Sequence, residues 1–255
     1  MVNSSRLQTP EIQQFLSSAR ASGTFTHAWE SYRDLVWKLA SQIENPRLLE
    51  VGGGRSPMFT EAEIETLNGT YTVNDIDASE LSLAPQWVER LLGDIADPSL
   101  SEVTELHGTF DLVFSLMVFE HVERPEQAYK NVAKFLASGG VVVNFIPTLY
   151  ALPFVVNRLL PERLTAPILR FFFPKRNPDE IPKFPAYYRW CTTTSKTERK
   201  LDSVGFRNST IVPFYGHRYY QRIPGLRSVA RRFWPVAFRR NWRSASTFAY
   251  ILAER

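Results

Sequence analysis

The chain has 255 residues, of which 44% are hydrophobic and 22% are charged, and this composition excludes a disordered or fibrous protein. A single cysteine, Cys191, excludes an internal disulfide framework and a zinc site built on several cysteines. No run approaches the ~18 apolar residues of a membrane-spanning helix. The first residues lack the basic flank and apolar stretch of a secretory signal, so we expect a cytoplasmic protein.

The net charge of +4 is divided unevenly along the chain. Residues 1–146 carry 10 lysines and arginines against 20 acidic residues, whereas residues 147–255 carry 20 against 6. Such a division indicates that the two parts of the chain have different tasks.

The predicted elements change from helices to alternating strands and helices near residue 46. Thr9-Pro10-Glu11 is typical of a helix start, because it combines a capping hydroxyl, a proline in the first turn and an acid near the positive end. The apolar spacing then predicts helices at about 9–19, 27–42, 124–136 and 194–204, with Ser138-Gly139-Gly140 closing the third. Strands are predicted at 47–51, 70–74, 90–92, 110–115, 141–146, 209–215 and 247–253.

Strands separated by helices favour parallel pairing with right-handed crossovers. We therefore predict an α/β protein with a Rossmann-like, doubly wound sheet of about seven strands, mostly parallel with an antiparallel last strand. The proline-rich but apolar stretch 147–190 is predicted to be an inserted helical cap.

A glycine-rich turn, Glu50-Val51-Gly52-Gly53-Gly54, follows the first predicted strand. Glycines permit positive φ angles and let a ligand approach the backbone closely. A nicotinamide fingerprint would need a third glycine at position 57, where this chain has Pro57, so that class is excluded. Another class binds a nucleoside without phosphates, and there Glu50 can hydrogen-bond to, or pair with, a cationic amino-acid tail.

Four ordered signals in residues 46–146 resemble the class I S-adenosylmethionine-dependent methyltransferases. They are Glu50-x-Gly52-x-Gly54, then Asp75 at a strand end, then Gly93-Asp94-Ile95, and finally the strand 110–115 with Phe119-Glu120-His121-Val122 and the later glycine pair. Ser56 stands where that family often has a third glycine.

The resemblance implies S-adenosylmethionine as the cofactor. It places Glu50, Gly52 and Gly54 around the methionine part, and Asp75 at the ribose hydroxyls. It places Asp94 at the adenine amino group with Ile95 packed on the base, and we count Ser115 at the end of the fourth strand among the cofactor-binding candidates. It also suggests a division into four parts: an N-terminal helical lid (1–45), a cofactor-binding core (46–146), the inserted cap (147–190) and the rest of the core (191–255). The last part includes a basic aromatic insertion at about 216–244.

Methyl transfer by in-line displacement mainly requires the protein to align donor and acceptor. An oxygen acceptor also needs a base near neutral pKa, and His121, just after the fourth strand, is the candidate. The alternative is that His121 caps the next helix or packs in the wall. Some quinone-pathway O-methyltransferases carry a metal-binding E-x-x-E-H arrangement, but Met117 replaces its first Glu here, so we predict no required metal.

Substrate choice is expected to depend on the insertions. Aromatic faces stack on sugars or rings, and basic groups take anions, so the cap residues of interest are Lys183, Tyr187, Tyr188 and Arg189. Alternatively, these aromatic residues belong to the core of a lid.

Residues 216–243 contain eight arginines, and no acid occurs between Asp202 and Glu254. Leu226, Val229, Ala230 and Phe233 form an apolar stripe at helical spacing. A basic amphipathic helix with tryptophans favours contact with an anionic membrane surface. A plain lid helix with solvated arginines and nucleic-acid binding are the alternatives, although no recognised RNA-binding module is present, which makes nucleic acid unlikely.

The sequence thus predicts an S-adenosylmethionine-dependent methyltransferase. The expected acceptor is an oxygen of a glycolipid, a polysaccharide-linked molecule or another amphiphilic small molecule. The alternatives are an RNA methyltransferase and a scaffold protein that kept the nucleoside site without catalysis. The sequence leaves the oligomeric state open.

Overall fold

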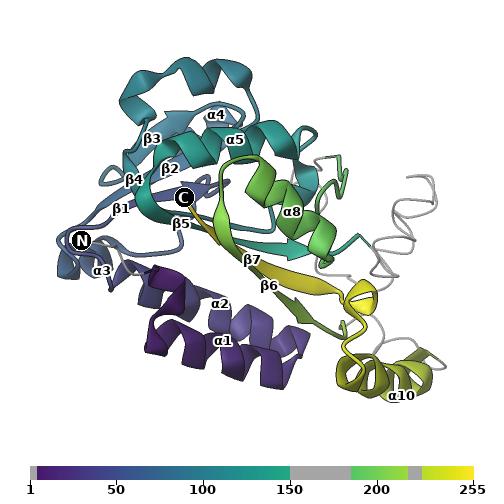
Figure 1. The fold of residues 1–255 in the computed structure, drawn as a ribbon. Helices are drawn as coiled ribbons and strands as arrows, with labels where there is room; N and C mark the ends of the chain where they lie inside the picture. The colour runs from purple at the N-terminus through teal and green to yellow at the C-terminus, as the bar shows by residue number, and fades with distance from the viewer. Residues whose placement is uncertain (1–4, 150–184, 218–225) are drawn as a thin grey trace.

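A seven-stranded sheet forms the centre of the molecule, in the order β3-β2-β1-β4-β5-β7-β6 (Figure 1). The computed structural model describes residues 5–149, 185–217 and 226–255. Most of the predicted cap at 147–190 lies outside these residues. The strands are β1 (Arg47–Val51), β2 (Thr70–Asp75), β3 (Glu89–Leu92), β4 (Phe110–Leu116), β5 (Leu136–Pro147), β6 (Arg207–Phe214) and β7 (Phe248–Glu254).

Strand directions in the sheet confirm the predicted fold class. All neighbouring pairs from β3 to β5 are parallel, and β7 is antiparallel to both β5 and β6. The strand order reverses between β1 and β4, because β1 leads outward to β2 on one side and β4 leads to β5 on the other. In open α/β sheets the ligand crevice lies outside the carboxyl ends of the strands at such a reversal.

Helices cover both faces of the sheet. Figure 1 shows α1 (Pro10–Ser22) and α2 (Phe25–Ala40) on one side, and α5 (Pro125–Phe135) and α8 (Ser195–Ser203) on the other. The other α-helices within the described residues are α3 (Glu61–Thr66), α4 (Ala78–Ser82) and α10 (Leu226–Arg239). The predicted N-terminal helical lid corresponds to α1 and α2, whose buried side chains, among them Leu16, Tyr32 and Val36, join the core on their face of the sheet.

The glycine pair after α5 has a different role from the predicted one. Helix α5 already ends at Phe135, and Leu136 is in extended conformation as the first residue of β5. Ser138-Gly139-Gly140 therefore lie within β5, where the pairing with β4 shifts register between Phe110 and Leu112. Gly139 has a φ of +75°. The glycines form an irregularity at the start of the strand rather than a helix end, because the same residue type suits both features.

Gly23 lies between α1 and α2 in the chain and is in contact with α10. It ends α1 with a φ of +58°, and its N–H donates to the Ala19 carbonyl. A Cβ atom at this position would lie 2.2 Å from a ring carbon of Phe238 on α10. Only a glycine satisfies both the left-handed backbone and this close approach.

We predict that Gly23→Ala lowers the free energy of unfolding by about 2 to 3 kcal/mol, since backbone strain and the contact with Phe238 add. Gly108→Ala is the matched control, because Gly108 has a φ of +66° but no atom within 4 Å of the added Cβ. It should cost only the strain, about 1 kcal/mol. Urea unfolding of the two variants measures the difference, and equal losses would contradict the predicted contact.

Candidate functional site

The glycine turn lies at the carboxyl end of β1, at the reversal of strand order. Gly52 and Gly54 have φ angles of +74° and +48°. The Gly52 N–H donates to the Asn74 carbonyl at 2.7 Å, which ties the turn to the end of β2. A Cβ atom on Gly52 would lie 2.5 Å from a methyl carbon of Val118, in the loop after β4. The turn therefore needs glycine both for its backbone angles and for the approach of the neighbouring loop.

Glu50 is buried beneath this turn. One of its carboxylate oxygens accepts hydrogen bonds from the Tyr71 hydroxyl at 2.5 Å and from the Met58 N–H at 2.9 Å. Burial raises the pKa of the carboxyl group, and the two donors partly offset that effect. The hydrogen bond from Met58 holds the segment that follows the glycine turn against Glu50. Glu50 therefore stabilises the turn, whether or not it also contacts a ligand.

Two carboxylates follow adjacent strands next to the turn. Asp75 ends β2, and its Oδ1 accepts from the Asp77 N–H at 2.9 Å, whereas its Oδ2 lies 3.1 Å from where a Cβ on Gly54 would be. Asp94 follows β3, and its Oδ1 accepts from the Ala96 N–H at 2.8 Å. Parallel pairing of β2 and β3 brings both acids to the same edge of the sheet.

Ile95 and Ser115, two further candidates, lie in the packed interior. Ile95 is buried in the core on the α5 face, and its carbonyl accepts from Asn131 at 2.8 Å. The hydroxyl of Ser115 donates to Asn144 Oδ1 at 2.7 Å, which links β4 to β5. Their predicted contacts with a cofactor stay predictions, as do those of Glu50, Gly52, Gly54, Asp75 and Asp94.

The loop after β4 carries the candidate base. A short 3-10 turn spans Phe119–His121, and the His121 side chain is partly exposed. Its Nδ1 lies 3.0 Å from the Pro185 carbonyl, and the Glu120 carbonyl accepts from the N–H groups of Tyr187 and Tyr188 at 2.7 and 3.0 Å. These bonds attach the segment 185–190 to the loop, although the two are more than 60 residues apart in the chain.

The Glu120 side chain is a buried carboxyl group beside His121. Its Oε1 lies 3.7 Å from His121 Nε2, while its Oε2 is buried without a hydrogen-bond partner among the described residues. Burial raises the pKa of Glu120 to about 8, because the charged form loses its hydration. The group is therefore neutral at pH 7 and ionises in mildly alkaline solution.

The predicted substrate-binding residues differ in how far they are exposed to solvent. Tyr187 is partly exposed, with the guanidinium of Arg189 lying 5.8 Å from its ring centre. Arg189 also donates to the Glu123 carbonyl at 2.9 Å. Tyr188 is buried in the core on the α5 face. Lys183 lies outside the described residues.

Asn74 is one functional candidate that sequence reasoning missed. Its side-chain amide donates to the carbonyls of Leu91 and Gly93, both at 2.9 Å, and so holds the turn before Asp94 against β2. Its position directly before Asp75 was the available signal. Val118 and Tyr71 were also missed, since apolar packing and a cross-strand hydrogen bond leave no distinctive pattern in the sequence.

Within the described ranges, no group of three or more histidine, cysteine, aspartate or glutamate side chains is arranged to hold a metal ion. That a metal is not required stays a prediction.

Comparisons with known proteins agree with the fold. A family model described as "Methyltransferase domain" matches residues 49–144, which run from β1 to β5. A highly reducing polyketide synthase of Neocamarosporium betae is 24% identical over 151 residues, covering 53% of this chain and 5% of the synthase. The chain thus spans only a small fraction of that curated relative.

Two solved structures show the same fold. A geranyl diphosphate C-methyltransferase from Streptomyces coelicolor A3(2) has a TM-score of 0.53 and 14% identity, covering all of this chain and 88% of that one. A phosphoethanolamine N-methyltransferase of Haemonchus contortus has a TM-score of 0.53 and 10% identity, covering 98% of this chain and 59% of that one. These two enzymes contained S-adenosyl-L-homocysteine and S-adenosyl-L-methionine.

We predict that Glu120→Gln makes the protein more stable than the wild type in alkaline solution. The folded-state pKa of about 8 lies above the ordinary value of 4.5, so wild-type stability is greatest in acid and falls as pH rises from about 4.5 to about 8. The variant avoids this loss, which is of the order of 3 to 5 kcal/mol.

Thermal unfolding between about pH 5 and pH 9 measures the effect, with curves that converge in acid and separate in base. Glu123→Gln, an exposed carboxyl nearby, is the matched control and should leave the pH profile unchanged. Parallel curves for wild type and Glu120→Gln would contradict a buried, neutral carboxyl.

Proposed function

We propose that this chain, whose residues 49–144 match a methyltransferase-domain family model, is a class I S-adenosylmethionine-dependent methyltransferase that transfers a methyl group to an oxygen of an amphiphilic small molecule. The match of residues 49–144 to a methyltransferase family model confirms the resemblance found in the sequence. One observation carries the proposal: the Glu120–His121 loop follows directly on Val118, which packs against the glycine turn at the strand-order reversal.

The residues at the turn fit the cofactor. Gly52 lets Val118 approach the turn, and Gly54 lets the Asp75 carboxylate lie directly beside the main chain of the turn, so a carboxylate acceptor and the turn adjoin one another. In this proposal the turn holds the methionine part, Asp75 accepts from the ribose hydroxyls and Asp94 accepts from the adenine amino group. When bound, S-adenosylmethionine supplies an electrophilic methyl group on a sulfonium centre.

His121 is proposed as the base that removes the acceptor proton. Its side chain is partly exposed in the loop after β4, and its Nε2 lies 3.7 Å from Oε1 of the Glu120 carboxyl group. The C- and N-methyltransferases with the same fold act on other atoms, so the oxygen acceptor rests on this pair alone.

The acceptor is proposed to be a glycolipid, a polysaccharide-linked molecule or another amphiphile. Support comes from the segment bonded to the His121 loop, which brings the Tyr187 ring and the Arg189 guanidinium beside it. An aromatic face suits a sugar or an apolar ring, and a guanidinium suits an anionic group. An RNA acceptor is the alternative that the exposed arginines of α10 support.

We predict that S-adenosylhomocysteine binds the wild-type protein saturably, and that Asp75→Ala weakens binding at least about tenfold, because hydrogen bonds to a charged group are lost. Isothermal titration calorimetry measures both constants. Asp202→Ala, an exposed acid on α8, is the matched control and should bind as the wild type does. No binding by folded wild-type protein would refute the proposed cofactor site.

We predict that His121→Gln leaves S-adenosylhomocysteine affinity unchanged but lowers methyl transfer about 100-fold or more, because the acceptor proton then lacks its base. The assay follows labelled methyl groups from S-adenosylmethionine into a lipid extract and, separately, into total RNA. Label in the RNA fraction alone would favour the alternative acceptor. An unchanged rate in the variant would remove His121 from the mechanism.

A further inference from the structure

Helix α10 connects β6 to β7 and has two unlike sides. Its inner side is attached to the rest of the fold: Ala237 is fully buried, and the Phe238 ring packs against Gly23 and lies 5.9 Å from the ring of Tyr215. The helix is therefore fixed in orientation, and its opposite side has a defined direction in the molecule.

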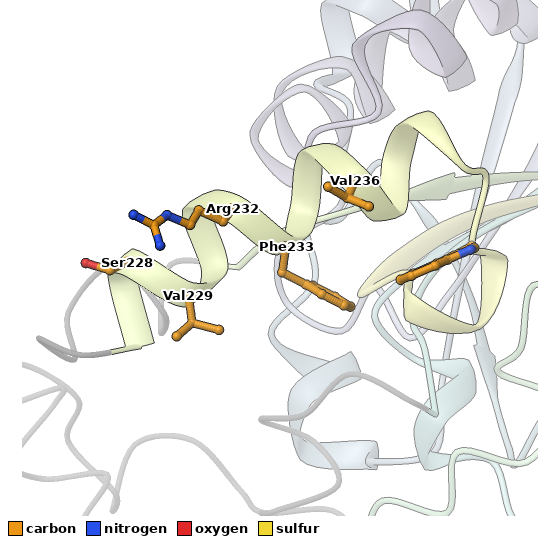
Figure 2. Close-up of a pocket in the computed structure, with 6 residues that line it drawn as sticks. Ser228, Val229, Arg232, Phe233 and Val236 are labelled. Carbon is orange, nitrogen blue, oxygen red and sulfur yellow. The ribbon is translucent and has the colours of Figure 1, made fainter.

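The outer side of α10 is apolar and exposed. Val229, Phe233 and Val236 are spaced at i, i+4 and i+7, and they are 63%, 39% and 42% exposed. Trp242, 41% exposed, continues this surface after the helix, with its ring 6.1 Å from that of Phe233. Figure 2 shows the labelled side chains on the helix, where they line an open groove together with Ser228 and Arg232. We call Val229, Phe233, Val236 and Trp242 the outer stripe.

Positive charge accompanies the outer stripe. Five arginines on or just after α10 are exposed and make no ion pair with any residue in the described parts of the chain: Arg227, Arg231, Arg232, Arg239 and Arg240. Arg240 also lies over the Trp242 ring at 5.7 Å. By contrast, Arg243 is partly buried and pairs with Glu198 at 3.5 Å. Because residues 203–253 contain no acid, nothing in this stretch of sequence neutralises these charges.

We propose that the outer stripe and its arginines dock this protein on an anionic lipid membrane. An apolar stripe bordered by arginines is the arrangement of a helix that lies in the interface, with the stripe among the acyl chains and the guanidinium groups at the headgroups. No helix in the described ranges has the length and apolar character needed to span a bilayer, so the contact is with one surface. Nucleic acid would engage the arginines but offers little to Val229 and Val236.

The position of α10 gives this docking a consequence for the candidate site. The helix lies in the chain between the end of β6 at Phe214 and the start of β7 at Phe248. These two residues pair with each other at the edge where β5 also ends at Pro147. The parallel strands β1 and β4 have their carboxyl ends at that same edge. Docking through α10 therefore brings the edge that carries the glycine turn and His121 close to the bilayer.

The test is flotation of the full chain with vesicles of phosphatidylcholine, and with vesicles in which about a third is phosphatidylglycerol, at about 0.15 M salt. The proposal expects binding to the anionic vesicles and at least about tenfold weaker binding to the neutral ones. It expects Val229→Ser with Phe233→Ser, and separately Arg232→Gln with Arg239→Gln, to lower the affinity at least about tenfold.

The matched controls are Leu83→Ser, an exposed apolar residue after α4, and Arg207→Gln, at the far end of β6 from α10. Both should bind vesicles as the wild type does, and circular dichroism confirms that each variant is folded. The proposal is overturned if folded wild-type protein ignores anionic vesicles, if the α10 variants bind as tightly as the wild type, or if an RNA oligonucleotide binds while vesicles do not. The measurement needs no methyl acceptor, so its failure leaves the proposed function standing.

Discussion

The buried carboxyl group of Glu50 is the interaction on which the arrangement of the site depends. It lies at the end of β1, under a turn that must fold back sharply, and it receives the Tyr71 hydroxyl from β2 and the Met58 N–H from the end of the turn. A carboxyl group removed from water needs such partners, because burial without them is costly. The two bonds therefore join β1, β2 and the turn, and they leave Asp75 facing Gly54.

Much of the core could be predicted from the sequence, because each strand has a local signal. The bounds of β1 were predicted to the residue, and those of β2 to β4 to within one residue, since short apolar runs there are bounded by charges or turn residues. The glycines at 138–140 were misassigned because a glycine pair ends a helix as readily as it opens an irregular strand. The position of Asp75 at the end of a strand was predictable because the charged residue itself marks the end of the apolar run.

The neighbours of Glu120 could not be predicted in this way. Its carbonyl accepts hydrogen bonds from the segment 185–190, and the spacing of residues in the sequence does not predict a contact between segments so far apart in the chain. Nor does periodicity tell which side of α10 faces the core: the chain has apolar residues on both, and the structure turns Ala237 and Phe238 inward and Val229 and Phe233 outward. Met117, Tyr188 and Trp190 have positive φ angles, a strained backbone for bulky residues that no residue-type rule anticipates.

The place of β7 in the sheet bears on the order in which the protein can be assembled during synthesis. β7 follows β6 in the chain, yet it lies between β5 and β6 in the sheet. The strands β5 and β6 therefore do not pair with each other. The Glu254 carboxylate of β7 accepts from the Leu7 N–H and the Asn208 side chain, so β7 also joins segments made at very different times. A nascent chain that has not yet reached residue 248 therefore holds β6 without its partner strand, and the sheet is completed only when β7 has been made.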